Sequence, residues 1–270
     1  MSIKTLAPSY FNRMKTAMEN IGKGRTVLNV GCGDGEYDRT LSAMFSRTVG
    51  VDINRSDIMS AKLGSGGNNH YAISGGEELP FRDNSFDAVI CMDVLEHIRD
   101  DKKVVSEIFR VLKDGGNLVL SVPHSRYPWT YDPVNGFLRP LGAHLPIGMW
   151  GFGHLRLYSR ELLTCIIEGA GFSIEKMEYL NHYLAGLLEN YLSFILSRSV
   201  KPDPTNRSRP GKPMISGRKA APGTLQRAVA GIIKLDNALF KNSGTSVGLL
   251  IKAKKQIRQT YKKPEVRSKL

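Results

Sequence analysis

The feature of this sequence that most constrains its fold is a short apolar run, Thr26–Val30, that ends in glycines at positions 31, 33 and 35. A continuous run of β-branched and aliphatic residues is typical of a buried parallel strand. Glycine reaches positive φ without steric cost and lets a ligand lie against the main chain. Residues 36–45 then place apolar side chains on one side and predict a helix. The segment therefore predicts a strand, a glycine loop and a helix, the unit at which open α/β sheets bind nucleotide-like ligands.

The spacing of Gly31, Gly33 and Gly35 bears on which ligand this unit binds. A dinucleotide site has the pattern G-x-G-x-x-G and holds a pyrophosphate at the helix N-terminus. Here the pattern is G-x-G-x-G, and the carboxylate of Glu36 would repel a pyrophosphate at that place. A dinucleotide site and a turn without a ligand remain the alternatives to a nucleoside site.

A second strand, predicted from Thr48–Val51, ends in Asp52. A carboxylate at the tip of the second strand can accept hydrogen bonds from both hydroxyls of a ribose. Ile53 would then lie beside the adenine. Asp52 could instead cap the helix predicted to begin near Ser56, a role that does not exclude ribose binding.

Residues 27–120 resemble the class I S-adenosylmethionine-dependent methyltransferases in four passages that occur in the right order. The passages are V-L-N-V-G-C-G-D-G, the strand that ends in Asp52, E-E-L-P-F-R-D-N-S-F-D-A-V-I from Glu77, and C-M-D-V-L-E-H-I from Cys91. The last is similar to the signature of the quinone O-methyltransferase branch. The resemblance implies a Rossmann-like α/β sheet in the order 3-2-1-4-5-7-6, with the last strand antiparallel, and S-adenosylmethionine as cofactor.

The resemblance also implies a set of cofactor-contacting residues, which lie in the matched passages. They are Asn29, Gly31, Cys32, Gly33, Asp34, Gly35, Asp52, Ile53, Gly76, Glu77 and Asp93. This chain departs from the pattern at Gly75, where many relatives carry an acidic residue that binds the adenine amino group. Main-chain groups of Gly76 and Glu77 could still reach the adenine edge.

Asp93, Glu96 and His97 stand at positions i, i+3 and i+4 and would share one face of a helical turn. Two carboxylates and an imidazole can ligate Mg²⁺ or a transition-metal ion. The favoured alternative is that Asp93 caps the turn while Glu96 and His97 line the pocket as hydrogen-bonding groups. A divalent metal is therefore possible here but not expected.

The connection that follows the fifth predicted strand, Pro123–Tyr158, is too long for an ordinary loop. It leaves the carboxyl end of a strand and carries five prolines and seven aromatic residues, which predicts a lid or a wall for a large apolar acceptor. Packing of these aromatic residues only on one another is the alternative. His124 and His154 are the candidate catalytic bases, because histidine titrates near neutral pH.

A helix opened by Ser159 and a sixth strand, Ser173–Tyr179, follow, but the hairpin partner of that strand comes only at residues 246–254. The domains expected from this pattern are a methyltransferase core at residues 1–183 and 245–254, with its lid at 123–158; a helical insertion at 184–244, with a basic linker at 197–223; and a basic tail at 255–270. Two amphipathic helices, Leu184–Leu196 and Leu225–Phe240, flank the linker.

The positive charge of the chain is concentrated in its last third. Residues 1–183 hold 20 Lys and Arg against 21 Asp and Glu, whereas residues 184–270 hold 18 against 4. An excess of this kind points to an anionic partner. Together with the two apolar helical faces, it predicts binding to an anionic membrane surface, with packing of both helices on the domain as the alternative.

Neither helix is long enough to predict a membrane span, and the first residues lack a basic-then-apolar leader. Three cysteines without a pairing pattern fit a reducing compartment. The sequence thus predicts a cytoplasmic enzyme, peripheral on a membrane, that methylates a hydrophobic or lipid-linked small molecule at oxygen. A methyltransferase acting on RNA or protein, with nucleic acid less favoured, and a non-catalytic binding module are the alternatives.

Overall fold

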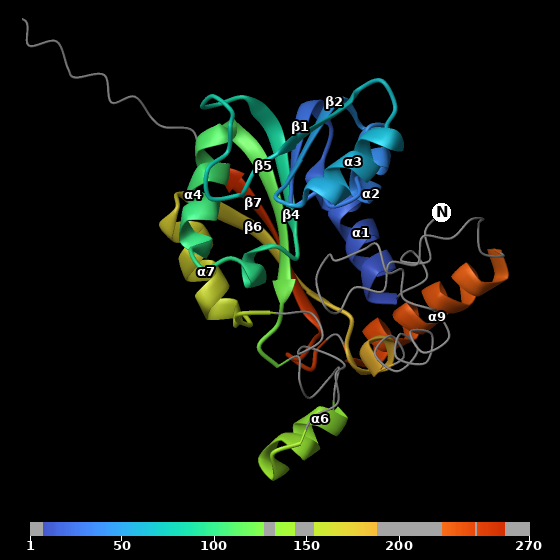
Figure 1. The fold of residues 1–270 in the computed structure, drawn as a ribbon. Coiled ribbons are helices and arrows are strands. Elements are labelled where there is room, and N and C mark those ends of the chain that lie inside the picture. The colour runs from blue at the N-terminus through green and yellow to red at the C-terminus, as the bar shows by residue number, and fades with distance from the viewer. Residues whose placement is uncertain (1–7, 127–132, 144–153, 188–222, 241, 257–270) are drawn as a thin grey trace, which may run out of the picture.

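The computed structural model contains a seven-stranded sheet in the order β3-β2-β1-β4-β5-β7-β6, which confirms the predicted order (Figure 1). It describes residues 8–126, 133–143, 154–187, 223–240 and 242–256. The strands are β1 (Gly24–Val30), β2 (Phe45–Asp52), β3 (Asn69–Ile73), β4 (Phe86–Met92), β5 (Leu112–Pro123), β6 (Phe172–Leu180) and β7 (Gly248–Lys255). The pairs from β3 to β5 are parallel, and β7 is antiparallel to both its neighbours, as predicted.

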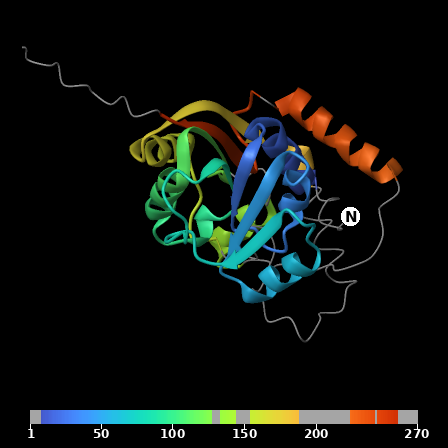
Figure 2. The same ribbon diagram turned by 90° about the horizontal axis from the view of Figure 1, so that it is seen from above.

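Helices cover both faces of the sheet, which is why its central strands are apolar on both sides (Figure 2). Helices α4 (Asp101–Val111) and α7 (Arg160–Gly169) pack on one face and bury Val104, Ile108 and Leu163 completely. Helices α1 (Pro8–Ile21) and α2 (Glu36–Leu41) belong to the core of the other face. The remaining helices are α3 (Arg55–Leu63), η2 (Leu95–His97), α6 (Pro133–Leu138), η3 (Arg139–Leu141) and α9 (Gly223–Phe240).

The hairpin between β6 and β7 is split by an insertion, as the sequence indicates. Ile251 of β7 pairs with Leu120 of β5 and with Met177 of β6, so the late strand fills the position between β5 and the edge strand β6. Asp236 of α9 is completely buried, and its carboxylate accepts hydrogen bonds from the main-chain nitrogens of His182 (2.6 Å) and Leu184 (2.8 Å). This pairing fixes α9 at the exit of β6.

Two element boundaries differ from the predicted ones. The helix predicted over residues 36–45 ends at Leu41, and Phe45 is the first residue of β2, where its side chain is buried. The fifth strand begins at Leu112 rather than at Asn117, with a register shift where Phe86 and Ala88 of β4 pair with it. From the sequence, Lys113–Gly116 is expected to form the C-terminal stop of the helix at residues 104–112, because glycine often ends a helix. In the structure both glycines lie within the strand.

Parts of the predicted lid and insertion can be placed. In the lid, α6 and η3 lie beyond the carboxyl end of β5 (Figure 1), and residues 127–132 and 144–153 fall outside the described part of the chain. In the insertion, residues 183–187 are helical. The rest of the first predicted helix, the linker up to residue 222 and the tail from residue 257 are not described. Of the helices in the described part, none is long and apolar enough to cross a bilayer.

Candidate functional site

The glycine loop connects β1 to α2 in a conformation that only glycine adopts readily. Gly31, Gly33 and Gly35 have φ values of 75°, 54° and 75°. A Cβ atom on Gly31 would lie 2.2 Å from Cγ2 of Val94, whereas a Cβ atom on Gly33 would meet nothing within 4 Å. The loop is therefore packed tightly on the side of β4 and open at its tip, where a ligand can approach the main chain.

Asp52 lies at the end of β2, and its carboxylate faces this loop. Oδ2 accepts a hydrogen bond from the main-chain nitrogen of Gly33 at 3.0 Å, and Oδ1 accepts one from that of Asn54 at 2.8 Å. A carboxylate has about four lone-pair sites, so Asp52 keeps acceptor capacity for two ribose hydroxyls. The neighbouring Ile53 is 68% exposed, which makes an apolar surface available beside the ribose position.

The alternative role of Asp52 as a helix cap is wrong. Asn54 caps α3 instead, because its side-chain oxygen accepts hydrogen bonds from the main-chain nitrogens of Ser56 (3.0 Å) and Asp57 (3.5 Å). Asp52 lies two residues earlier and faces Gly33. The cap and the candidate ribose ligand are thus two different side chains.

Beneath the loop, two of the predicted cofactor residues make contacts inside the protein. The side-chain amide of Asn29 donates a hydrogen bond of 2.8 Å to Asp38, and the Sγ atom of Cys32 lies 3.6 Å from the main-chain oxygen of Gly33. Asp38 is completely buried, and burial raises its pKa to about 7. Burial also raises the pKa of the Cys32 thiol. Asn29 and Cys32 therefore stabilise the glycine loop through contacts within the protein.

The segment predicted to contact adenine, residues 75–77, is held between β2 and α4. The main-chain nitrogen of Ser74 donates a hydrogen bond to the main-chain oxygen of Asp52 at 3.1 Å. A Cβ atom on Gly76 would lie 3.1 to 3.2 Å from Val104 and Val30, whereas one on Gly75 would meet nothing within 4 Å. Gly75 thus leaves open space at the position where many relatives carry an acidic side chain.

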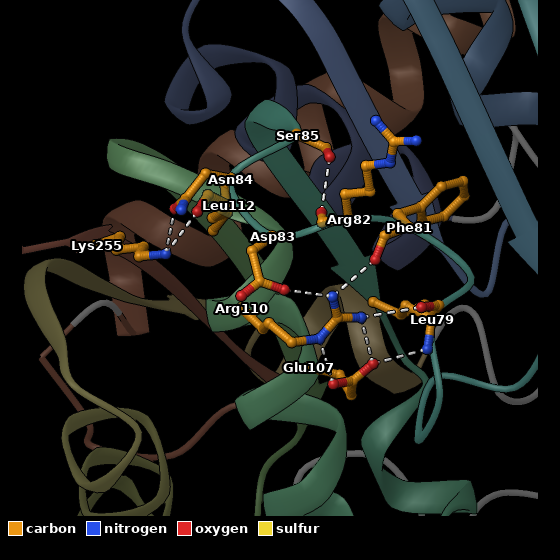
Figure 3. Close-up of polar contacts among 10 residues, drawn as sticks. All are labelled: Leu79, Phe81, Arg82, Asp83, Asn84, Ser85, Glu107, Arg110, Leu112 and Lys255. Atoms are coloured by element: carbon orange, nitrogen blue, oxygen red, sulfur yellow. Dashed lines mark hydrogen bonds and ion pairs between the residues drawn. The ribbon is translucent and has the colours of Figure 1, made fainter.

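Arg110 of α4 fixes the chain that follows this segment (Figure 3). Its guanidinium donates to the main-chain oxygens of Leu79 (3.0 Å) and Phe81 (2.7 Å) and to the carboxylate of Asp83 (2.8 Å). It also binds Glu107 at 2.7 and 2.8 Å, and Glu107 in turn accepts from the main-chain nitrogen of Leu79 at 2.9 Å. These contacts hold the pKa of Glu107 below its usual value. Local sequence patterns do not reveal this network, because Glu107 and Arg110 come 24 or more residues after Leu79, Phe81 and Asp83.

Asp93 ends β4 in a left-handed conformation, with φ of 53°, which is uncommon for a residue other than glycine. Its carboxylate pairs with Arg13 of α1 at 2.8 Å and accepts a hydrogen bond from Ser121 at 2.9 Å. Arg13 connects the N-terminal helix to the carboxyl end of β4. Neither Arg13 nor Ser121 carries a sequence signal that would have assigned it to the site.

The expected helical turn of Asp93, Glu96 and His97 is not formed, because η2 comprises only Leu95–His97 and Asp93 is in the left-handed region. A different group comes together: the ligand atoms of Glu96, His97 and His154 all lie within 4.8 Å of one another. Glu96 is completely buried. Burial and the neighbouring His97 lower the pKa of His154 to about 4, so its imidazole is neutral at pH 7.

The other candidate base, His124, lies apart from this group. It is buried at the end of β5, where Nδ1 lies 3.2 Å from the hydroxyl of Ser246 and its ring packs near that of Tyr179. Burial lowers the pKa of His124 as well. The structure therefore brings His154 to the residues that follow β4 and leaves His124 between β5 and the start of β7.

Three comparisons place this geometry among known proteins. Residues 28–120 match the family described as "Methyltransferase domain". The ubiquinone/menaquinone biosynthesis C-methyltransferase UbiE of Vibrio cholerae is 39% identical over 109 residues, which cover 36% of this chain and 40% of the relative. The sterol 24-C-methyltransferase of Yarrowia lipolytica is 34% identical over 166 residues, covering 58% and 42%.

The crystal structure of the cyclase SpnF is similar with a TM-score of 0.59 and 20% identity, covering 90% of this chain and 80% of that one. At this identity the likeness concerns the fold alone. The chain covers about half or less of the length of the curated relatives it matches. The family match contains the glycine loop, Asp52 and residues 77–98 but ends at residue 120, before the lid and the insertion.

Proposed function

We propose that this chain, which belongs through residues 28–120 to the class I S-adenosylmethionine-dependent methyltransferases, methylates a hydrophobic or lipid-linked small molecule at a membrane surface. The observation that carries the proposal is the carboxylate of Asp52 facing an open glycine loop. This arrangement fits a nucleoside cofactor, because the loop approaches without side chains while the carboxylate accepts ribose hydroxyls.

The residues of the chain have separate tasks in this proposal. Gly33 and Asp52 hold the ribose end of S-adenosylmethionine, and Ile53 covers one side of its adenine. The bound cofactor supplies an activated methyl group on a sulfonium. The protein then has to hold the acceptor in line with that group and to keep water away, which accounts for most of the rate gain in such a transfer. His154, neutral at pH 7, would accept the proton that the acceptor loses.

The names of the relatives support an apolar acceptor. A relative named for ubiquinone and menaquinone biosynthesis and one named for a sterol are among the proteins that this chain resembles. The described part of the lid presents Phe137 and Leu141, which are 73% and 70% exposed. Both relatives are named as C-methyltransferases, so transfer to carbon is a second candidate beside the expected transfer to oxygen. A general base is needed in either reaction, because the acceptor loses a proton from oxygen or from carbon.

Membrane binding is the proposal for the basic last third of the chain. Helix α9 presents Leu235 and Leu239, which are 53% and 61% exposed, while its buried Asp236 ties it to the core. Each Lys or Arg near an anionic surface adds about 1 kcal/mol of attraction, which salt screens. Exposed leucines on α9 and an excess of basic residues in the sequence before and after this helix together favour reversible binding to anionic lipid.

The test is transfer of a labelled methyl group. The protein is incubated with methyl-labelled S-adenosylmethionine and, in separate reactions, with a lipid extract, an RNA fraction and a protein fraction. We expect label in the lipid extract, and mass spectrometry of the product then gives the methylated atom. Label in RNA or protein would replace the proposed acceptor. Cofactor binding without transfer to any fraction would favour a non-catalytic module.

A further inference from the structure

We propose that Glu96, His97 and His154 form a binding site for one divalent transition-metal ion of the kind represented by Zn²⁺, Co²⁺ and Mn²⁺. No residue of the glycine loop contributes to the site. The three residues are the ones in the described part of the chain whose ligand atoms gather within 4.8 Å of one another.

The separations between the ligand atoms fit a single ion. Oε1 of Glu96 lies 3.8 Å from Nε2 of His97 and 4.0 Å from Nε2 of His154. Two ligands on a tetrahedral ion, each bonded at about 2.1 Å, are about 3.4 Å apart. The two separations from Glu96 exceed this value by about 0.4 and 0.6 Å, and all three ligand atoms lie within 4.8 Å of one another, so side-chain rotations would have to bring them closer around an ion.

The donor atoms select the kind of ion. Two imidazoles and one carboxylate suit Zn²⁺, Co²⁺, Mn²⁺ and Fe²⁺, whereas Mg²⁺ and Ca²⁺ prefer an all-oxygen set. Three protein ligands also leave at least one coordination position open, as in catalytic rather than structural metal sites. The site would therefore hold a borderline transition-metal ion together with water or an oxygen atom of a ligand.

The site is buried, which strengthens the interaction of a cation with its ligands. Glu96 has 1% of its side chain exposed, and the side chains of His97 and His154 have 19% and 11% exposed. Removing a carboxylate from water is costly unless positive charge or hydrogen bonds compensate for it. A divalent ion between Glu96 and the two imidazoles would place two positive charges next to that carboxylate.

The ligands come from distant parts of the chain, and a second set of contacts holds them together. The main-chain nitrogen of Leu155 donates a hydrogen bond to the main-chain oxygen of Glu96 at 2.8 Å. Arg156 binds the carboxylate of Asp101 at 2.8 Å, and the hydroxyl of Tyr158 donates to the same carboxylate at 2.8 Å. These contacts fix the segment that carries His154 against the segment that carries Glu96 and His97. Supporting contacts of this kind orient metal ligands before the ion binds.

Asp93 does not belong to the site, although the sequence places it three residues before Glu96. Its two carboxylate oxygens are bonded to Arg13 and Ser121. Its carboxylate oxygens are not among the ligand atoms that gather within 4.8 Å of one another. The proposed set therefore differs from the one expected from sequence by the exchange of Asp93 for His154, and the two sets predict different effects of mutation.

The consequence for methyl transfer rests on the proposed function. A bound cation would lower the pKa of an acceptor hydroxyl that enters its open position, so that the hydroxyl would release its proton to water before methyl transfer. His154 would then serve as a ligand of the ion instead of as the base. Metal binding can be measured without cofactor or acceptor, so failure of this inference is distinguishable from failure of the proposed function.

The test uses the full chain, stripped with EDTA and dialysed. Titration with Co²⁺ should give visible absorption bands that saturate at one ion per chain and disappear when Zn²⁺ is added. We expect Glu96→Gln and His154→Gln to weaken Co²⁺ binding at least tenfold. Asp93→Asn should leave the affinity unchanged, and so should His70→Gln, which alters an exposed histidine on β3.

One further measurement would decide the matter even if a ligand variant does not fold. Pulsed electron paramagnetic resonance of Mn²⁺ bound to the unmutated protein should detect two imidazole nitrogens. The inference is overturned if the unmutated protein binds no ion, if no imidazole nitrogen is detected, or if Asp93→Asn abolishes binding while His154→Gln does not. Loss of binding in His70→Gln would indicate a surface site and overturn it too.

Discussion

Oδ2 of Asp52 lies 3.0 Å from the main-chain nitrogen of Gly33, so one carboxylate joins the end of β2 to the glycine loop that follows β1. The other oxygen accepts a hydrogen bond from the main-chain nitrogen of Asn54. The carboxylate is thus held in place at the point where the ribose of a nucleoside would lie.

We predict that Asp52→Ala weakens S-adenosylmethionine binding at least tenfold. A hydrogen bond to a charged group contributes about 1.5–3 kcal/mol, and 1.4 kcal/mol corresponds to a factor of ten in affinity. Calorimetric titration of the unmutated and mutated proteins measures the change. The matched control is Asn54→Ala, which removes the cap of α3 and should cost about 1 kcal/mol of folding stability while leaving the affinity in place. Equal affinities of Asp52→Ala and the unmutated protein would remove Asp52 from the site.

Arg110→Ala should weaken cofactor binding through the loop that Arg110 holds, not through the methyl transfer step. The guanidinium binds Leu79, Phe81 and Asp83, in the chain that follows the predicted adenine contact (Figure 3). We expect a rise in the KM for S-adenosylmethionine with little change in kcat. We also expect a loss of about 1–2 kcal/mol in folding stability, a moderate value because the Arg110 side chain is 30% exposed and water weakens its contacts.

The control for this prediction is Arg82→Ala in the same loop, where only the main-chain oxygen of Arg82 takes part in the drawn contacts (Figure 3). It should change neither KM nor stability. A fall in kcat with an unchanged KM in Arg110→Ala would contradict the assigned role.

Asp38→Asn should become more stable relative to the unmutated protein as the pH rises from about 4 to about 7. Burial raises the pKa of Asp38 in the folded state to about 7 from a usual value of 3.8, so the unfolded chain loses this proton first. The folded state is therefore destabilised as the pH rises through this interval, and an asparagine avoids the penalty. Urea unfolding at several pH values measures the difference, which should grow by about 4 kcal/mol between pH 4 and a pH above 7.

Other titrating groups change the stability of both proteins equally with pH, so their effects cancel in the comparison. One of them is His154, whose lowered pKa makes the folded protein more stable as the pH rises. Asp114→Asn serves as the matched control, because the Asp114 side chain is 43% exposed. Its stability difference should be nearly constant with pH. A difference for Asp38→Asn that is also constant would mean that Asp38 is not held protonated in the folded protein.

The protein should sediment with anionic liposomes at low salt and be released at high salt. Changing Leu235 and Leu239 to Ser should reduce the bound fraction several-fold, because both side chains are more than half exposed on α9. Leu63→Ser is the control, since Leu63 is 87% exposed on a different helix, α3. Protein that stays in the supernatant at low salt would refute membrane binding, and equal loss in the control would show that α9 is not the anchor.

The sequence by itself predicted the order of the sheet through its resemblance to a known family, and it predicted the strand, the glycine loop and the carboxylate of the candidate cofactor site. Thr26–Val30, the three glycines and Asp52 encode this information locally, because a buried strand, a tight loop and a carboxylate at a strand tip each depend on residues close together in the chain. Strand β7 was also predictable, because one late apolar run was available to complete the sheet.

Tertiary structure decided which side chains meet. The spacing of Asp93, Glu96 and His97 suggested a shared helical face, but the left-handed conformation of Asp93 directs that residue to Arg13 and Ser121. Its place beside Glu96 is taken by His154, which is 58 residues further along the chain. The contacts of Arg110 with Leu79 and of Asp236 with His182 likewise join distant residues. Such contacts depend on how packed elements approach one another in space, and periodicity and local spacing carry no information about them.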